Sequence, residues 1–182
     1  MPGSDHQQGI HAHRSAGVGS NAASGYAPIT LEELVDSAWS SIRPLADKRS
    51  VRLSLDRCDD SRMLGGQQRL HRAVLHLLDN ALRHSPNGNT VDVKILSSGA
   101  WWIFSIMDHG SGLSESDLKG MFQRFYSGDP SRARSARSSS GLGLSIVQQI
   151  AVNHGGRVEA RNHPDGGACM ERLLPKDHPV SA

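Results

Sequence analysis

Apolar residues recur at helical spacing in three stretches of the chain, at residues 31–45, 70–81 and 141–154. Spacings of three and four residues place these side chains along one face of a helix. Each stretch therefore predicts an amphipathic helix that buries one face. A shorter fourth helix is expected to start near Ser114, which has Asp117 three residues later.

Alternation of apolar and polar residues predicts the strands. It runs through residues 51–55, 91–96 and 101–107, and two further segments, 158–161 and 168–174, flank a Pro-Asp-Gly-Gly turn as in a hairpin. The predicted fold class is α+β. We expect a two-layer α/β sandwich, with a mixed, mostly antiparallel sheet of about five strands and three main helices on one face.

Local signals predict where the first and third helices begin and end. Thr30 followed by Glu33 is a capping-box pattern at the start of the first helix. Pro44 predicts a kink or an early end of that helix, because proline removes a backbone donor. Glycines at 155–156 predict the end of the third helix.

The composition divides the chain into three expected segments. Residues 1–27 contain almost no large apolar side chain and predict a flexible tail or linker, in which solvated histidines are favoured over metal ligands. Residues 28–176 form one domain, and residues 177–182 form a C-terminal tail. Within the domain, residues 127–140 are rich in Ser and Arg without periodicity and predict a mobile loop.

The bulk composition excludes several function classes. The chain is 37% hydrophobic and 21% charged, with a formal net charge of +2. So small a charge argues neither for nor against nucleic acid, which binds a concentrated basic face, and no nucleic-acid partner is expected. No run approaches the roughly 18 apolar residues of a membrane span, so no membrane contact is expected. Cys58 and Cys169 are isolated and are interpreted as reduced thiols of a cytoplasmic protein.

Asn80 is the first candidate for chemistry. It lies late in the second helical stretch, within the run LLDNA, near the edge of the apolar stripe. An amide oxygen at this position is able to coordinate a hard cation such as Mg²⁺. Taken alone, an asparagine near a helix end is more often a surface or capping residue.

Asp108 is the second candidate. It follows an alternating strand directly and is followed by the run HGSG. Glycines let the backbone turn sharply behind a carboxylate that points into a cleft. Such a carboxylate accepts a hydrogen bond from an exocyclic amine like that of adenine. An ordinary Asp-Gly turn is the alternative.

The third candidate is the run SGLGLSIV at residues 140–147, where a loop enters a helix. Glycines there allow close approach of a ligand, and the free N–H groups of a helix start bind phosphate. No Lys-Ser or Lys-Thr pair follows, so this is not a Walker motif. A packing role for the glycines is the alternative.

Four runs of the sequence resemble, in the right order, the N, G1, F and G2 boxes of sensor histidine kinases. They are RLHRAVLHLLDNALRHSPNG, DHGSGL, MFQRFYSGDPSRAR and SSSGLGLSIVQQIAVNHGGRVEA. The resemblance covers about residues 28–175. It implies the Bergerat fold shared with gyrase B, Hsp90 and MutL ATPases, with ATP and Mg²⁺ as cofactors.

The resemblance also implies roles for individual residues. Asn80 matches the Mg²⁺-binding asparagine, and Asp108 matches the aspartate that binds the adenine amine, with Gly110 and Gly112 shaping the adenine pocket. Asn80 and His76 occupy catalytic positions. Further cofactor-binding positions are Arg83, His84, Phe122, Phe125, Tyr126, Arg132, Arg134, Ser140, Gly141, Leu142, Gly143 and Leu144.

The F-box and the loop after it have implied roles as well. Phe122 and Phe125 match the aromatic residues that anchor the ATP lid, and the lid corresponds to residues 127–140. Arg132 and Arg134 in this segment are candidates to screen phosphate charge. A solvated basic loop is the alternative explanation for them.

The sequence departs from the family's pattern at several positions. His76 stands where relatives often have a second Asn that helps to hold Mg²⁺, and imidazole is a poorer partner for this hard cation. Arg72 replaces a frequent Glu or Gln, and His109 replaces the usual Asn or Asp. Ser111 replaces a frequent Pro, and Ser139 replaces a frequent Gly.

The resemblance implies transfer of the γ-phosphoryl group of ATP to a histidine on a separate dimerisation domain, for relay to a response regulator receiver domain. None of the ten histidines of the chain has the context of that phosphoacceptor motif. We therefore expect an isolated monomeric domain that binds ATP and does not phosphorylate itself. The location expected is cytoplasmic, either in a soluble kinase or in the cytoplasmic part of a membrane-bound sensor.

Two alternative functions stay open at this point. The first is a serine kinase of the anti-sigma-factor type with the same fold, although the run FQRFYSGDPSRAR favours the histidine kinase. The second is a degenerate module that binds nucleotide or a partner without transferring phosphate. His76 and Ser139 are the residues that favour the second alternative.

Overall fold

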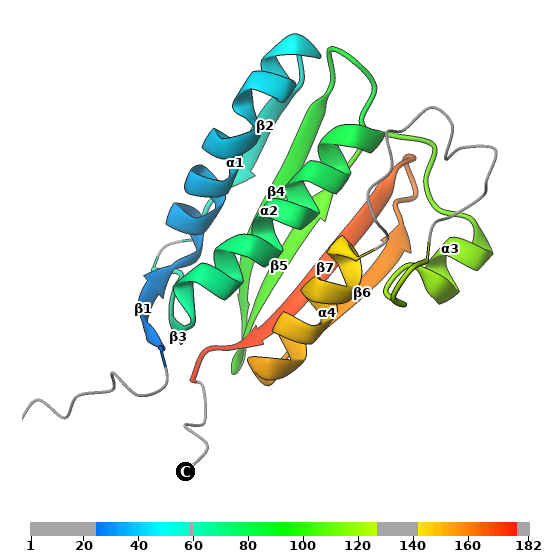
Figure 1. The fold of residues 1–182 in the computed structure, drawn as a ribbon. Helices are drawn as coiled ribbons and strands as arrows, with labels where there is room; N and C mark the ends of the chain where they lie inside the picture. Colours follow the sequence, from blue (N-terminus) through cyan, green and yellow to red (C-terminus); the bar gives the residue numbers. More distant parts are fainter. Residues whose placement is uncertain (1–24, 59, 127–141, 178–182) are drawn as a thin grey trace, which may run out of the picture.

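The computed structural model describes residues 25–58, 60–126 and 142–177. Most of the expected tails and all of the expected mobile loop lie outside this part of the chain. The described residues form the elements of Figure 1. In order these are β1 (Ala27–Thr30), α1 (Leu31–Lys48), β2 (Arg52–Asp56), β3 (Arg62–Gly65), α2 (Gln67–His84), β4 (Thr90–Ser98), β5 (Trp101–Met107), α3 (Glu115–Gly120), α4 (Gly143–Asn153), β6 (Arg157–Asn162) and β7 (Ala168–Pro175).

Five strands form one mixed sheet in the order β2-β4-β5-β7-β6. β2 and β4 are parallel, and every other neighbouring pair is antiparallel. A parallel pair needs a long crossover, which here contains β3 and α2. The expected mixed, mostly antiparallel sheet of five strands is therefore confirmed.

Helices α1, α2 and α4 lie side by side across one face of this sheet (Figure 1). The alternation along β4 and β5 points one set of side chains into the layer between sheet and helices. That set is fully buried and comprises Val91, Val93, Ile95, Trp102, Phe104 and Ile106. The predicted two-layer α+β sandwich is confirmed.

The small sheet formed by β1 and β3 was not expected from the sequence. The two strands pair antiparallel, with Ile29 opposite Met63 and Thr30 opposite Arg62. Each strand has only four residues. So short a segment shows too little alternation to distinguish a strand from a loop.

Helix α1 differs from expectation at both ends. Thr30 is its N-cap, but the side chain makes no capping bond. Thr30 is also the last residue of β1, and the chain beside that small sheet caps the helix instead, because the Leu31 N–H donates to the carbonyl of Ser61 at 3.1 Å. The early end expected at Pro44 does not occur, since α1 continues to Lys48.

The other predicted helix ends are confirmed. Ser114 and Asp117 form a reciprocal capping box at the start of α3. At the end of α4, Gly155 has a φ of 67°. The N–H groups of Gly155 and Gly156 donate to carbonyls of the last turn, both at 2.9 Å. This is a Schellman motif, which stops the helix and satisfies its last carbonyls.

His154 ties the end of α4 to the start of α2. Its ring is fully buried, and Nε2 accepts the N–H of Gly66, the N-cap residue of α2, at 3.1 Å. Because Nε2 accepts, the ring proton lies on Nδ1 and is donated to the carbonyl of Ile150 at 2.7 Å. The ring of Tyr26 packs against His154, with 5.1 Å between ring centroids.

Within the described part of the chain, neither Cys58 nor Cys169 forms a disulfide bond. Cys169 is buried in β7. Burial raises the pKa of its thiol, and the nearby Glu171 and Asp108 carboxylates raise it further, while Arg161 opposes them. A neutral buried thiol is neither a good nucleophile nor a good metal ligand, so Cys169 serves as a packing residue.

Arg172 is the anomaly of the core. It lies in β7 opposite Phe104 of β5 and Val158 of β6, and 1% of its surface is exposed. None of its three guanidinium nitrogens has a hydrogen-bond partner among the described residues. Burial lowers its pKa to about 9. The side chain is thus a buried and unpaired cation, which costs folding free energy.

Replacing Arg172 by Met is expected to stabilise the domain. An apolar side chain of similar length removes the unpaired charge and still fills the space, so we expect a gain of about 1–4 kcal/mol. Urea unfolding measures the change. Arg157→Met, which breaks an exposed pair with Glu159 on β6, is the control and should change stability by less than about 0.5 kcal/mol. Lower stability of Arg172→Met than of the wild type would contradict the prediction.

Candidate functional site

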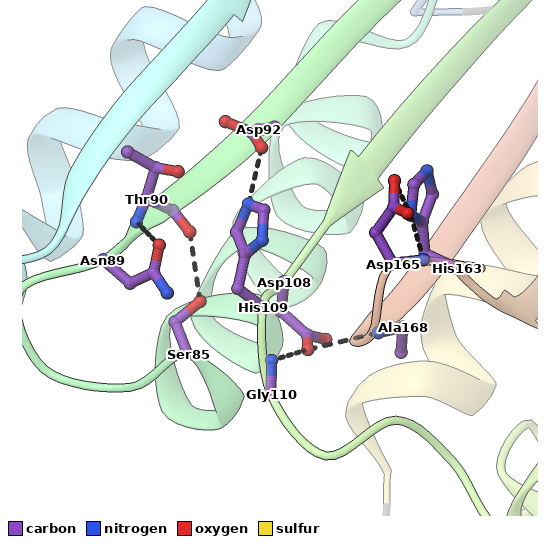
Figure 2. A network of polar contacts seen from close by, with 10 residues as sticks. All are labelled: Ser85, Asn89, Thr90, Asp92, Asp108, His109, Gly110, His163, Asp165 and Ala168. Carbon is purple, nitrogen blue, oxygen red and sulfur yellow. Dashed lines mark hydrogen bonds and ion pairs between the residues drawn. The ribbon is translucent and has the colours of Figure 1, made fainter.

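Asp108 directly follows β5, and 3% of its surface is exposed. Figure 2 shows the bonds that orient it. Oδ1 accepts the N–H of Gly110 at 2.9 Å and the N–H of Ala168 at 3.2 Å. Among the described residues no group donates to Oδ2, which leaves that oxygen as the acceptor for an N–H group of a ligand.

Two glycines let the backbone pack closely around this carboxylate. A Cβ placed on Gly110 would lie 2.4 Å from the carbonyl oxygen of His84, at the end of α2. A Cβ on Gly167 would lie 1.9 Å from the carbonyl oxygen of Asp108, and Gly167 also has a φ of 87°. Any larger residue at either position would push the turn after β5 out of place.

Asn162 of β6 holds the next part of the loop. Its Oδ1 accepts the N–H of Leu113 at 2.7 Å, and its Nδ2 donates to the carbonyl of Leu113 at 2.9 Å. Gly112 lies under this clamp, because a Cβ there would be 2.9 Å from Oδ1. The two predicted glycines, Gly110 and Gly112, therefore both shape the loop beside Asp108.

Asn80 and His76 lie one turn apart on α2, and both are half-buried. The ring of His76 packs against Gly143, since a Cβ on Gly143 would lie 3.3 Å from Nδ1. The predicted metal-binding helix and the start of α4 thus meet here. Arg83 is paired on the helix surface with Asp79, with 2.8 Å between Nε and Oδ2.

His76 is a neutral imidazole in this site. Burial lowers its pKa below the usual value, and the positive charge of Arg72 lowers it further, whereas Asp79 raises it. At neutral pH the ring therefore adds no positive charge beside Asn80. Imidazole is expected to be a weak partner for Mg²⁺, but a neutral ring does not also repel the cation.

The first turn of α4 presents free donors. Leu142 is the N-cap, and the first bond within the helix runs from the Ile146 N–H to the Leu142 carbonyl at 3.0 Å. The N–H groups of Gly143, Leu144 and Ser145 precede that bond and have no acceptor in the helix. Such a helix start attracts anions.

The F-box residues differ from one another in packing. Phe122 and Tyr126 pack against the core, and the Tyr126 hydroxyl donates to Oδ1 of Asp117 at 3.1 Å. Phe125 is 76% exposed and has a φ of 61°. Phe122 and Tyr126 are thus attached to the domain, whereas Phe125 projects from it.

The described residues bring the predicted site together in two groups. One group surrounds Asp108, and the other joins Asn80 and His76 to Gly143. Arg132, Arg134, Ser140 and Gly141 lie outside the described residues. The sequence did not predict that the site includes Asn162, Gly167 and Ala168. They come from the hairpin of β6 and β7, and only the register of β7 beside β5 reveals their role.

Residues 65–178 match the profile of the histidine kinase-, DNA gyrase B- and HSP90-like ATPases. The chain belongs to this family. Its ATP-binding fold, expected from four sequence motifs, is confirmed, and ATP is the ligand that the family implies.

The relatives of this ATPase domain are sensor proteins. The sensor protein SphS of Synechococcus elongatus is 41% identical over 155 residues, which cover 82% of this chain and 38% of SphS. The sensor-like histidine kinase SenX3 of Mycobacterium tuberculosis is 33% identical over 147 residues, which cover 81% of this chain and 36% of SenX3. The chain thus spans little more than a third of the length of these relatives.

Two solved structures superpose on more than four-fifths of the chain. The mycobacterial sensor histidine kinase MprB superposes with a TM-score of 0.70 at 25% identity, covering 85% of this chain and 99% of that one. The ATP-binding domain of PrrB from Mycobacterium tuberculosis gives a TM-score of 0.66 at 28% identity, covering 84% and 98% of the two chains.

Two further observations constrain the ATPase domain. Among the described residues, no helix has both the length and the apolar composition needed to cross a membrane. Within the same part of the chain, no three His, Cys, Asp or Glu residues gather to hold a metal ion.

A surface groove of about 530 Å³ runs between the start of α2 and the outer face of α4. Arg69, Arg72 and Arg124 contribute cationic groups, and Phe125 and Ile146 contribute apolar surface. The groove adjoins the first turn of α4, where the free N–H groups lie. Basic and apolar side chains therefore lie together in this groove, next to the first turn of α4.

The lowered pKa of His76 predicts a pH dependence of stability. Below the unfolded-state pKa of about 6.5 the unfolded chain takes up a proton that the folded site resists, so folding weakens as the pH falls. His76→Asn should therefore lose less stability between pH 7 and pH 5 than the wild type. Urea unfolding at both pH values measures this, and equal losses would show that His76 titrates alike in both states.

Proposed function

We propose that this chain is the catalytic part of a sensor histidine kinase. It binds ATP with Mg²⁺ and transfers the γ-phosphoryl group to a histidine on a helical dimerisation domain, from which a response regulator receives it. The buried Asp108 carboxylate carries the proposal, because one oxygen is held by two backbone N–H groups and the other is left for a ligand.

The carboxylate of Asp108 supports selection of adenine. Adenine presents an exocyclic amine, which donates to a carboxylate oxygen, whereas guanine presents a carbonyl oxygen at the equivalent position and would be repelled. Oδ1 is held by Gly110 and Ala168, so Oδ2 meets the base in one direction. We therefore propose Asp108 as the residue that distinguishes ATP from GTP.

The phosphates are proposed to lie between α2 and α4. The free N–H groups of Gly143 and Leu144 are placed to bind phosphate oxygens. Asn80 would hold Mg²⁺ by its amide oxygen, and that ion would neutralise charge on the phosphates. His76 packs on Gly143, between Asn80 and the start of α4. Because its lowered pKa keeps the ring neutral, His76 adds no positive charge there.

The role of these residues in the reaction is positioning. Phosphoryl transfer asks little covalent chemistry of a protein, and its barrier falls mainly through alignment and charge neutralisation. Asp108 and the glycine loop hold the base, and the start of α4 orients the phosphates. The attacking imidazole belongs to the dimerisation domain.

An Asp108→Asn variant is expected to lose ATP binding. The amide turns an N–H group or a neutral oxygen toward adenine in place of a charged acceptor, which removes about 1.5–3 kcal/mol of binding free energy. Calorimetric titration of ATP with Mg²⁺ into both proteins measures the change. The control Asp165→Asn, at an aspartate 91% exposed, should bind as the wild type does. Equal binding by Asp108→Asn would refute the role of the carboxylate.

The arginine-lined groove is the proposed contact for the helical domain. It adjoins the phosphate end of α4, so a helix seated in it can present its histidine to the γ-phosphate. Ile146 and Phe125 supply apolar contact, and Arg69, Arg72 and Arg124 supply charge that an acidic face of that helix would complement.

A helical domain with its acceptor histidine, taken from a sensor kinase relative and supplied in trans, is expected to gain acid-labile phosphohistidine from ATP. Ile146→Glu is expected to slow this transfer at least tenfold, because a carboxylate in the groove repels the acidic face of the helix. The ATP affinity of the variant should stay unchanged. Quenched time courses with radiolabelled ATP measure both proteins.

The two rival functions give different products in the same assay. Acid-stable phosphoserine on a protein substrate would favour the serine kinase. ATP binding without any transfer would favour the degenerate binding module. In either case the histidine kinase proposal would be wrong, although the nucleotide site at Asp108 would stand.

The location and oligomeric state follow from this function. We propose a cytoplasmic domain, because ATP and response regulators are found there. We also propose that the isolated chain is a monomer, since the helices that dimerise these kinases belong to the acceptor domain. A stable dimer in light scattering would contradict this.

A further inference from the structure

The turn that carries Asp108 is held on three sides. From β7, Ala168 binds both the backbone and the side chain of Asp108. From the end of α2, the carbonyl of His84 packs under Gly110. From β4, Asp92 bonds to the side chain of His109, with 2.6 Å between Oδ2 and Nε2 (Figure 2).

The sheet register explains why Asp92 is within reach. Asp92 of β4 lies opposite Met107, the last residue of β5, so it stands level with the end of that strand. His109 comes two residues after Met107, and its ring turns back to β4. The two side chains are 32% and 24% exposed. Partial removal from water makes their contact stronger than an ordinary surface pair.

The contact lies next to the proposed adenine acceptor. His109 is bonded directly to Asp108 along the chain, and its Cα lies 3.1 Å from the Cβ position of Gly167. The bonds from Gly110 and Ala168 both reach Oδ1 of Asp108, so the orientation of the carboxylate depends on where the backbone places these two N–H groups. His109 directly precedes Gly110, so the bond from its ring to Asp92 restrains the backbone that carries the Gly110 N–H.

We propose that His109 is a positioning residue which, through Asp92, fixes the direction in which Asp108 presents its free oxygen. The inference rests on the proposed adenine role of Asp108. Asp92 and His109 come from separate segments, and neither is required to touch the nucleotide. The pair would increase the affinity for adenine by holding the turn ready before the ligand arrives.

The test is a double-mutant cycle on ADP affinity without Mg²⁺, so that the metal plays no part. His109→Ala and Asp92→Ala should each weaken binding about threefold to tenfold. The double variant should be no weaker than either single one, because the two side chains act as a unit. Asp92→Asn should restore most of the affinity, since its amide oxygen still accepts from Nε2. This rescue separates the contact from a general need for a side chain at that position.

His163→Ala is the matched control. His163 also lies near an aspartate, with 3.7 Å between its Nδ1 and Oδ2 of Asp165, but that pair is local to the turn between β6 and β7. Its removal should leave ADP binding unchanged. The inference fails if both alanine variants bind ADP within twofold of the wild type, or if their losses add in the double variant.

A second measurement needs no nucleotide. The amide protons of Gly110 and Ala168 both point at Oδ1 of Asp108, so their NMR chemical shifts report its position. Both should move in His109→Ala and stay in place in His163→Ala. If the wild type binds no ADP, the proposed function of Asp108 fails, and these shifts alone decide whether the pair positions the turn. Unmoved shifts would overturn the inference.

Discussion

The site depends on the close approach of two backbones, where β7 begins beside the end of β5. Gly167 leaves no room for a side chain above the carbonyl of Asp108, and Ala168 exchanges backbone and side-chain bonds with the same residue. A carboxylate buried this deeply is stable only when its hydrogen bonds are made. The pairing of β5 with β7 provides them, and it also fixes which way the loop toward Gly112 leaves the sheet. The orientation of Asp108, the proposed adenine acceptor, thus depends on strand register.

The second half of the site depends on how the helices meet. α2 carries Asn80 and His76, while α4 brings Gly143 against the His76 ring. At the other end of the same two helices, buried His154 joins the end of α4 to the N-cap of α2. The two contacts set the spacing of α2 and α4 at both ends. The proposed phosphate site therefore depends on helix packing, and the turn proposed to bind the base depends on the sheet.

Much of this was predictable from the sequence, for physical reasons that differ by residue. Long amphipathic helices and alternating strands are local patterns, and Asp108 and Asn80 belonged to motifs with recognisable neighbours. Residues whose role depends on a distant partner were missed. Thr30 was expected to cap α1 with its side chain, yet pairing of β1 with β3 brought the Ser61 carbonyl to that task. The sequence indicated only a turn residue at Gly167, because the close contact of Gly167 with the Asp108 carbonyl forms only when β5 and β7 pair. Arg172 is a charged residue at a buried position of β7, and nothing in the described structure explains the cation there.

The two ends of helix α4 differ in their backbone hydrogen bonds. Its last turn is closed by the Schellman glycines and by the bonds of His154, whereas its first turn offers N–H groups that have no helical acceptor. A helix that had to shift to receive phosphate would spend reorganisation energy in every catalytic cycle. In this one the free N–H groups of the first turn and the helix dipole already face the proposed phosphate site, and the last turn is closed by its own hydrogen bonds. Binding and release of a nucleotide there would not require the hydrophobic core beneath the helix to repack.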